Sequence, residues 1–241
     1  MSGHGPSFGR IVGRREALAM LGAGACLASP FATALAADAG TSSSCVATPE
    51  QTEGPFFVDE RLNRADIRAD PVSGTVKDGV PLALGLVVHR VSAQGCAPLA
   101  GAVVDVWHCD ALGNYSDVNG SGARTAGQKF LRGYQITDAQ GGVQFATIYP
   151  GWYPGRTAHI HFKVRGETPS RGRYAFTSQL YFDDAMSDRV YVRAPYAEAG
   201  KRSIGNRGDY LYRSSGQALT VALRESGPGL DGRFDIGLRL A

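Results

Sequence analysis

The sequence predicts an all-β protein, built as a β-sandwich of about eight strands with short helices and long loops. Many short runs alternate apolar and polar residues and end at turn residues, which is the pattern of half-buried strands. The 241 residues include 32 glycines and 12 prolines, a turn-rich composition. No long segment repeats its apolar residues every 3.6 positions, so only a short helix is expected, around residues 184–198.

Eight runs have the length and alternation of strands. They cover residues 82–92, 102–108, 129–136, 142–149, 158–165, 175–183, 218–224 and 233–240. Turn residues separate them, as in the Gly-Gly step that ends at Gly142. The run 158–165 is the clearest, because Ile160, Phe162 and Val164 alternate with polar positions and would face a core.

Two histidines lie in that run, at His159 and His161. Successive side chains of a strand point to opposite faces, so these two imidazoles share a face, with about 7 Å between their Cα atoms. They could converge on one metal ion. Taken alone, the pair fits two surface or packing histidines equally well.

The type of metal depends on the further donors. A zinc hydrolase would need a third histidine, either His89 or His108, and His108 is in phase with Val104 and Val106, as a core histidine would be. Tyrosine is the better candidate, because a phenolate is a hard anionic oxygen that suits ferric iron, and a bound metal can deprotonate a phenol. Two tyrosines with two histidines therefore indicate iron.

Four segments, in this order, resemble the intradiol ring-cleavage dioxygenases, non-haem ferric enzymes that open catechols between their two hydroxyls. They run from Thr48 to Phe57, Gly101 to Ser116, Phe130 to Asp138 and Tyr149 to Val164. The resemblance covers most of the chain after its first 36 residues. It implies a prealbumin-like β-sandwich and a ferric ion, Fe(III), as the cofactor.

The resemblance also implies the residues of the site. Tyr115, Tyr153, His159 and His161 match the metal ligands, and Tyr153 is the ligand expected to leave when substrate binds. Arg156 matches an active-site arginine that stabilises negative charge over the substrate ring, and Gln179 matches a glutamine of the same cavity. Tyr149, a neighbouring aromatic, is expected to pack at a strand end and to bind no metal. Each residue is assigned from the family motif that it matches in this sequence.

The implied reaction is cleavage of a catechol-type vicinal diol with O2 to a muconate-type diacid. Catechol, protocatechuate, hydroxyquinol and larger phenolic diols all fit as the substrate partner. Two other classes stay open on the residues alone. One is a non-enzymatic β-sandwich binding module, which predicts no stoichiometric iron. The other is a zinc or copper enzyme that uses the two histidines and a third donor.

The N-terminal segment reads as an export signal. Arg14 and Arg15 precede an apolar run over residues 17–28, and Ala34-Leu-Ala36 offers a cleavage site. We therefore expect a twin-arginine signal over 1–36, with an ordinary secretory signal as the alternative, and a catalytic domain over 37–241. The domain would be periplasmic or extracellular, with no membrane attachment after signal removal.

Charge and cysteine content add two expectations. Residues 1–36 hold three of the 25 basic and one of the 22 acidic side chains, so the remaining net charge is about +1, which gives no indication of nucleic-acid binding. Cys45, Cys96 and Cys109 remain, and one disulfide with one free thiol is expected. A full strand would separate Cys96 from Cys109, so Cys45 is the expected partner of either.

Two further segments need a structure to interpret. Residues 202–213 are polar and are predicted to form a solvated loop, with a position at the rim of the site as the alternative. Phe56 and Phe57 would lie near the site according to the family resemblance, although their residue types alone indicate only a turn and core aromatics.

Overall fold

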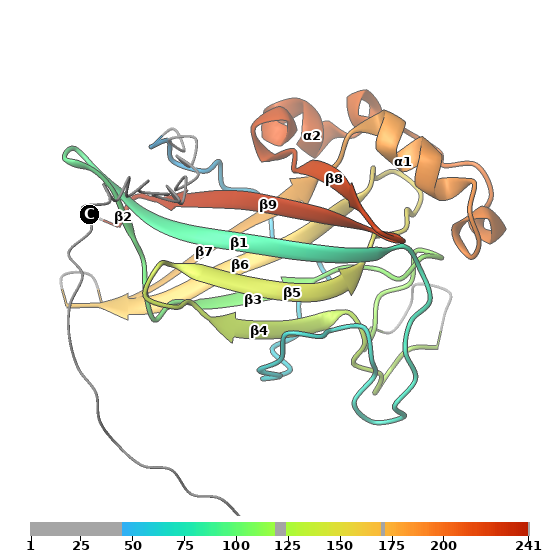
Figure 1. The fold of residues 1–241 in the computed structure, drawn as a ribbon, viewed down its shortest axis with the longest axis horizontal. Coiled ribbons are helices and arrows are strands. Elements are labelled where there is room, and N and C mark those ends of the chain that lie inside the picture. The colour runs from blue at the N-terminus through green and yellow to red at the C-terminus, as the bar shows by residue number, and fades with distance from the viewer. Residues whose placement is uncertain (1–44, 119–123, 170–171, 241) are drawn as a thin grey trace, which may run out of the picture. The chain divides into compact units, whose positions relative to one another are not determined.

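The computed structural model describes residues 45–118, 124–169 and 172–240. The export signal predicted at 1–36 lies outside these residues. The described residues form nine strands in two β-sheets, with two short α-helices, and Figure 1 shows the sheets as two layers. The predicted β-sandwich is confirmed. No helix in the described ranges is long and apolar enough to cross a membrane.

The five-stranded sheet is organised around β1. Its order is β2-β1-β9-β8, and β5 pairs with the same edge of β1 as β2 does. Its strands are β1 Pro81–Ser92, β2 Gly95–Pro98, β5 Gly142–Ile148, β8 Ala222–Ser226 and β9 Gly229–Leu238. The β1–β9 pair is parallel and the other pairs are antiparallel.

The four-stranded sheet is antiparallel throughout and has the order β4-β3-β6-β7. Its strands are β3 Val103–Trp107, β4 Arg132–Ile136, β6 His159–Thr168 and β7 Gly172–Tyr181. In β6, Ile160, Phe162 and Val164 are fully buried in the core cluster that also contains Leu84 and Leu86 of β1. The other side chains of β6 therefore lie on the outer face of this sheet.

The helical segments are short, as expected. They are α1 Asp184–Tyr191, α2 Tyr210–Ser215 and three 3-10 turns, η1 Tyr196–Ala199, η2 Asn206–Gly208 and η3 Gly216–Leu219. Figure 1 shows the helices grouped beside β8. The helix predicted at 184–198 is present as α1, but it ends early because Pro195 follows its last turn. Helix α2 was not predicted.

The strand predictions differ from the structure mainly at β2. Residues 95–98 have no apolar alternation and were expected to be a loop. They form a strand because a tight turn at residues 93–94 returns them onto β1, where Cys96 pairs with Val91. The strand predicted at 218–224 begins later, at Ala222, since η3 occupies the residues before Thr220.

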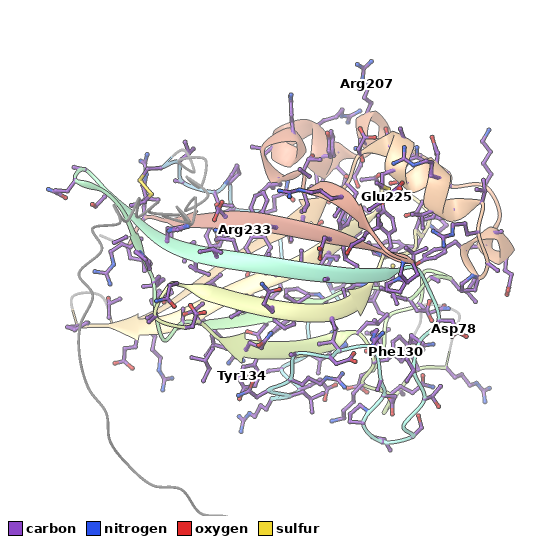
Figure 2. The ribbon with its side chains drawn as sticks, viewed as in Figure 1. Asp78, Phe130, Tyr134, Arg207, Glu225 and Arg233 are labelled. Atoms are coloured by element: carbon purple, nitrogen blue, oxygen red, sulfur yellow. A yellow bond between two sulfur atoms is a disulfide. The ribbon has the colours of Figure 1, made fainter. Side chains whose placement is uncertain are left out.

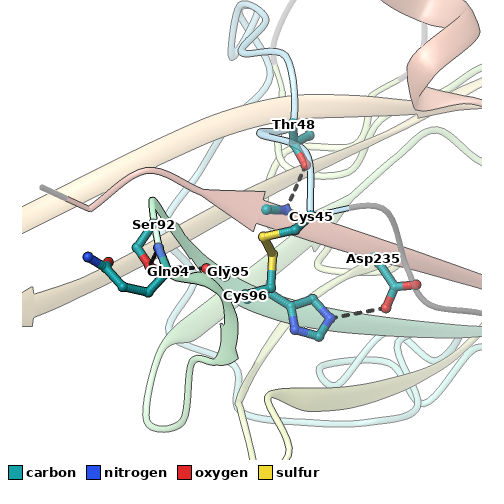
Figure 3. Close-up of a disulfide and its surroundings, with 9 residues drawn as sticks. Cys45, Thr48, Ser92, Gln94, Gly95, Cys96 and Asp235 are labelled. Carbon is teal, nitrogen blue, oxygen red and sulfur yellow. Dashed lines mark hydrogen bonds and ion pairs between the residues drawn. A yellow bond between two sulfur atoms is a disulfide. The ribbon is translucent and has the colours of Figure 1, made fainter.

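The predicted disulfide joins Cys45 to Cys96 (Figure 3). Cys109 is a buried free cysteine. Nearby, the Thr48 N–H donates to the Gly237 carbonyl and the Gly237 N–H donates to the Thr48 hydroxyl. The disulfide and this pair attach the segment that begins at Cys45 to the five-stranded sheet.

Removing the disulfide should destabilise the domain without unfolding it. The bridge closes a loop with a sequence separation of 51 residues, and loop closure of this size restricts the unfolded chain by about 2–4 kcal/mol. We expect Cys45→Ser with Cys96→Ser to lower the free energy of unfolding by that amount in a denaturant titration. Cys109→Ala is the control that leaves the bridge intact, and an unchanged midpoint in the double variant would contradict the expectation.

Candidate metal centre

Four predicted ligand side chains converge on the outer face of the four-stranded sheet. His159 and His161 both lie on β6 and share a face, as predicted. Tyr115 comes from the loop after β3, and Tyr153 from the loop after β5. The Tyr153 hydroxyl lies 3.1 Å and the Tyr115 hydroxyl 3.3 Å from His159 Nε2. Residues that are 44 positions apart in the chain thus meet around one nitrogen.

The orientation of His159 is set by a backbone carbonyl. Its Nδ1–H donates to the Thr157 carbonyl at 2.7 Å, which leaves the Nε2 lone pair directed at the two phenol oxygens. Burial, with a smaller contribution from the Arg156 charge, lowers the pKa of His159 to about 3. The ring is therefore neutral at ordinary pH, which is the form that binds a metal.

The orientation of His161 has a different cause. Its ring stacks on Trp107, with centroids 4.9 Å apart and planes 9° from parallel. Its Nδ1 is buried and has no hydrogen-bond partner among the described residues. Aromatic stacking therefore holds this imidazole where most metal-binding histidines use a hydrogen-bond acceptor. Burial lowers the pKa of His161 well below its usual value, so this ring is neutral too.

Burial shifts the pKa of the two phenols in the opposite direction. Burial raises the pKa of Tyr153 to about 12 and that of Tyr115 well above its ordinary value. A phenolate is stable there only if a cation replaces the proton. Two phenolates and two neutral imidazoles suit a hard trivalent ion, because the phenolates balance two of its three charges. The donor set therefore fits ferric iron.

Tyrosine is essential to this fit. The described ranges contain no cluster of three or more His, Cys, Asp or Glu side chains that could hold a metal. His108 is fully buried, with Nδ1–H donating to the Cys109 carbonyl and Nε2 accepting from the Thr147 hydroxyl. It is a satisfied core histidine, as predicted. His89 lies on β1 beside Asp235, 3.3 Å away.

Two glycines set how closely the tyrosine loops approach each other. A Cβ on Gly151 would overlap the Asp110 and Ala111 carbonyl oxygens, and a Cβ on Gly113 would overlap the Trp152 carbonyl oxygen. The Gly151 N–H also donates to the Asp110 carbonyl at 3.2 Å. The loops before Tyr115 and Tyr153 therefore pack backbone to backbone, and only residues without a side chain permit this spacing.

Arg156 and Gln179 lie together at this site. Arg156 Nη2 donates to Gln179 Oε1 at 2.6 Å, and Gln179 is the cross-strand partner of His161. The structure thus brings together all six predicted site residues. Tyr149 lies in the main core, where its hydroxyl pairs with Ser187 at 2.7 Å, so it is separate from the four convergent donors.

Residues 48–57, which we call the strap, cover the imidazoles and phenols. Phe56 stacks on Tyr115 with centroids 4.5 Å apart, and Phe57 packs edge-on against Trp107 at 4.9 Å. Gly54 lies against His161, because a Cβ there would be 3.4 Å from its Cε1. The strap is attached through backbone groups, which bond to the residues Thr177, Ser178, Gln179 and Arg132.

The prediction of a solvated loop at 202–213 is wrong for two residues. Asn206 is buried and Asp209 is fully buried, whereas Arg207 between them is exposed and points outward in Figure 2. Asp209 Oδ2 accepts from Arg156 Nε at 2.7 Å. Its place before Tyr210 and Leu211 is an N-cap signal for a short helix, which the polar composition of the segment obscured. Trp107 was also missed, although it is out of phase with the core residues Val104 and Val106.

Most of the described chain is similar to a known protein family. Residues 52–205 match the family model described as Dioxygenase, a span that includes every residue of the site except Asp209. The beta chain of protocatechuate 3,4-dioxygenase from Burkholderia cepacia is 36% identical over 198 residues, which cover 77% of this chain and 76% of that protein.

Two further relatives extend the comparison. Catechol 1,2-dioxygenase 1 from Acinetobacter lwoffii is 28% identical over 191 residues, which are 67% of this chain but only 58% of that protein. The solved structure of an intradiol ring-cleavage dioxygenase from Tetranychus urticae has a TM-score of 0.71 at 28% identity, covering 81% of this chain and 95% of that one.

We expect a side chain at Gly151 to weaken metal binding. Gly151 has an ordinary backbone conformation, so Gly151→Ala adds only the overlap with the Asp110 loop and should separate Tyr153 from Tyr115. We expect metal affinity to fall about tenfold or more, as it does when ligand orientation is disturbed, measured as iron per chain after dialysis. Gly85→Ala on β1 is the control, because its Cβ would meet only the movable Gln144 side chain. Equal iron content in both variants would show that the backbone contact at Gly151 does not determine metal affinity.

We expect the buried His108 side chain to make the folded protein less stable in acid. Burial lowers its pKa to about 4, from an ordinary value of 6.5. The unfolded chain therefore binds this proton more readily, and stability falls as the pH drops from about 6.5 towards 4. The full loss is about 3 kcal/mol for this one residue. Urea unfolding of the metal-free protein at several pH values should show a shallower pH dependence in His108→Gln. A slope equal to that of the parent would show that His108 does not contribute.

Proposed function

Because the chain belongs to the intradiol ring-cleavage dioxygenase family, we propose that it is a non-haem Fe(III) enzyme that cleaves catechol-type vicinal diols between their hydroxyls with O2. The products would be muconate-type diacids. The observation that carries the proposal is the convergence of the Tyr115 and Tyr153 hydroxyls on His159 Nε2, beside His161. Family membership argues against a non-enzymatic binding module.

Tyr115, Tyr153, His159 and His161 would hold the ion. Bound ferric iron would accept both catechol oxygens and draw electron density from the ring, which makes the ring reactive towards O2. Tyr115 is 1% exposed and stacked under Phe56, so it suits a permanent ligand. Tyr153 is less buried, so it suits the ligand that leaves. Its hydroxyl would then hold a proton taken from the diol.

Arg156 and Gln179 would act on the substrate ring. The guanidinium is held on one side by Asp209 and on another by the Gln179 amide oxygen. A fixed cation beside developing negative charge lowers a barrier without reorganising during the reaction, often by a few kcal/mol. The strap would limit water around the substrate, because Phe56 and Phe57 cover Tyr115 and Trp107.

The substrate is proposed by class. The relatives are named for catechol and for protocatechuate, and both compounds are aromatic rings with two adjacent hydroxyls. The chain spans 58% of the first of these relatives and 76% of the second. Family membership supports a vicinal diol as the common element, and the choice among catechol, protocatechuate, hydroxyquinol and a larger phenolic diol is a matter for product analysis.

We also propose that the enzyme is exported. Arg14-Arg15 and the apolar run behind them support a twin-arginine signal over 1–36. The Cys45–Cys96 disulfide supports an oxidising compartment, because such bonds are rare in reducing cytosol. Twin-arginine export carries folded proteins and would allow iron to be inserted first.

The visible spectrum tests the proposal directly. Iron-loaded protein should show a broad tyrosinate-to-iron band that shifts when catechol is added without oxygen, with iron close to one per chain. Tyr115→Phe and Tyr153→Phe should each weaken the band, because each removes one phenolate. Tyr149→Phe is the matched control, since that hydroxyl bonds only Ser187. A colourless protein after iron loading would overturn the dioxygenase proposal, and zinc or copper in its place would favour the alternative metalloenzyme.

A further inference from the structure

We propose that Asp209 is a positioning residue, which holds Arg156 and the Thr157 peptide in place at the metal centre. The contacts of Asp209 follow from geometry alone. Their catalytic consequence rests on the function proposed above. Asp209 lies outside the part of the chain matched by the family model, which ends at residue 205. Its side chain is 0% exposed, and that of Arg156 is 13% exposed.

The two carboxylate oxygens of Asp209 have separate partners. Oδ1 accepts from the Leu211 and Tyr212 N–H groups, at 2.9 and 3.3 Å, and so caps the N-terminus of α2. Oδ2 accepts from Arg156 Nε at 2.7 Å and from the Thr157 N–H at 3.0 Å. One oxygen therefore fixes the carboxylate to its own helix, and the other fixes two adjacent residues of the loop that leads into β6.

Both of those loop residues act on the site. Arg156 reaches Gln179 through Nη2, so its Nε bond to Asp209 leaves the guanidinium held at two points and limits its rotation. The Thr157 carbonyl accepts the Nδ1–H of His159. A shift of the Thr157 peptide would therefore also turn a metal ligand. Displacements of about 1 Å at such positions can reduce a rate about 100-fold.

The position of Asp209 is itself fixed through α2. Gln51, in the strap, donates to the Leu211 carbonyl at 3.0 Å and to the Ser215 hydroxyl at 2.9 Å. The same amide accepts the Tyr181 hydroxyl at 2.7 Å. Helix α2 is thus held between the strap and the arginine. The Tyr181 hydroxyl also lies 3.3 Å from Gln179 Oε1, the acceptor of Arg156, and this contact closes the set of hydrogen bonds behind Arg156. A closed set of this kind specifies one geometry.

Asparagine cannot replace this carboxylate. Asn is as good an N-cap as Asp, so its oxygen can still accept from Leu211 and Tyr212. Its NH2 group would then face the Arg156 Nε–H and the Thr157 N–H, which are both donors. Asp209→Asn therefore keeps the cap and removes the two contacts that the proposal needs. Asp183→Asn is the matched control, because Asp183 caps α1 through Ala185 and Met186.

The first test uses metal-free protein and needs no activity. A buried charge-assisted hydrogen bond protects a proton from solvent exchange, so the Arg156 Nε–H should give a slowly exchanging NMR signal, assigned by its loss in Arg156→Ala. We expect this signal to exchange at least tenfold faster in Asp209→Asn and to be unchanged in Asp183→Asn, with both variants folded by circular dichroism. A signal equally protected in Asp209→Asn would overturn the proposal. If Asp209→Asn does not fold, Asp209→Glu, which keeps the charge but moves it, takes its place.

The second test measures kcat per bound iron in a double-mutant cycle. Asp209→Asn should lower kcat about 10- to 100-fold in the parent and by less than about threefold in an Arg156→Ala background, because its main target is then absent. Release of iron to a chelator should also be faster in Asp209→Asn, through Thr157 and His159. An equal loss of kcat in both backgrounds, together with an unchanged rate of iron release, would show that Asp209 acts only on the fold. If the parent itself binds no iron or cleaves no diol, the proposed function fails, and the exchange experiment still decides the role of Asp209.

Discussion

The site depends on the two-residue repeat of β6. Alternate side chains of a strand point to opposite faces, so Ile160, Phe162 and Val164 enter the core while His159, His161 and Lys163 lie outside. The apolar residues fix the register of the strand, because a slip by one residue would turn the imidazoles into the core. The same packing that stabilises the sandwich therefore determines where the two nitrogens lie, and every other part of the site is brought to this face.

Two kinds of contact bring the other site residues to this face of the sheet. Backbone-to-backbone packing at Gly113 and Gly151 brings the tyrosine loops together, and the strap lies over them with Phe56 on Tyr115. The Cys45–Cys96 disulfide attaches the residues that precede the strap, and hydrogen bonds to β7 attach the strap itself. The polar groups behind Arg156 are paired with one another, which limits the free-energy cost of burying them and fixes the guanidinium.

Burial sets the protonation states of the four convergent donors. Burial keeps both imidazoles neutral and both phenols protonated, so the site carries little charge of its own apart from Arg156. A hard metal ion could displace the phenol protons, and each phenolate so formed would neutralise one charge of the ion. Asp209 balances the charge of Arg156 at a distance of 2.7 Å, which allows a guanidinium to be placed beside the proposed metal site.

The sequence by itself determined most of the strands and the shared face of His159 and His161. The alternation in β6 predicted both the core residues and the shared face of His159 and His161, because period-two patterning is a local property of the chain. Together with the family resemblance, the motifs also located Tyr115, Tyr153, Arg156 and Gln179, which the structure brings together. In contrast, Trp107 under His161, the glycine contact between the loops and Asp209 behind Arg156 were decided only by the tertiary structure. Each is a contact between segments distant in the chain: Arg156 and Asp209 are 53 residues apart. A polar stretch such as 202–213 has the same composition whether its carboxylate meets water or a buried guanidinium, and only packing decides between them.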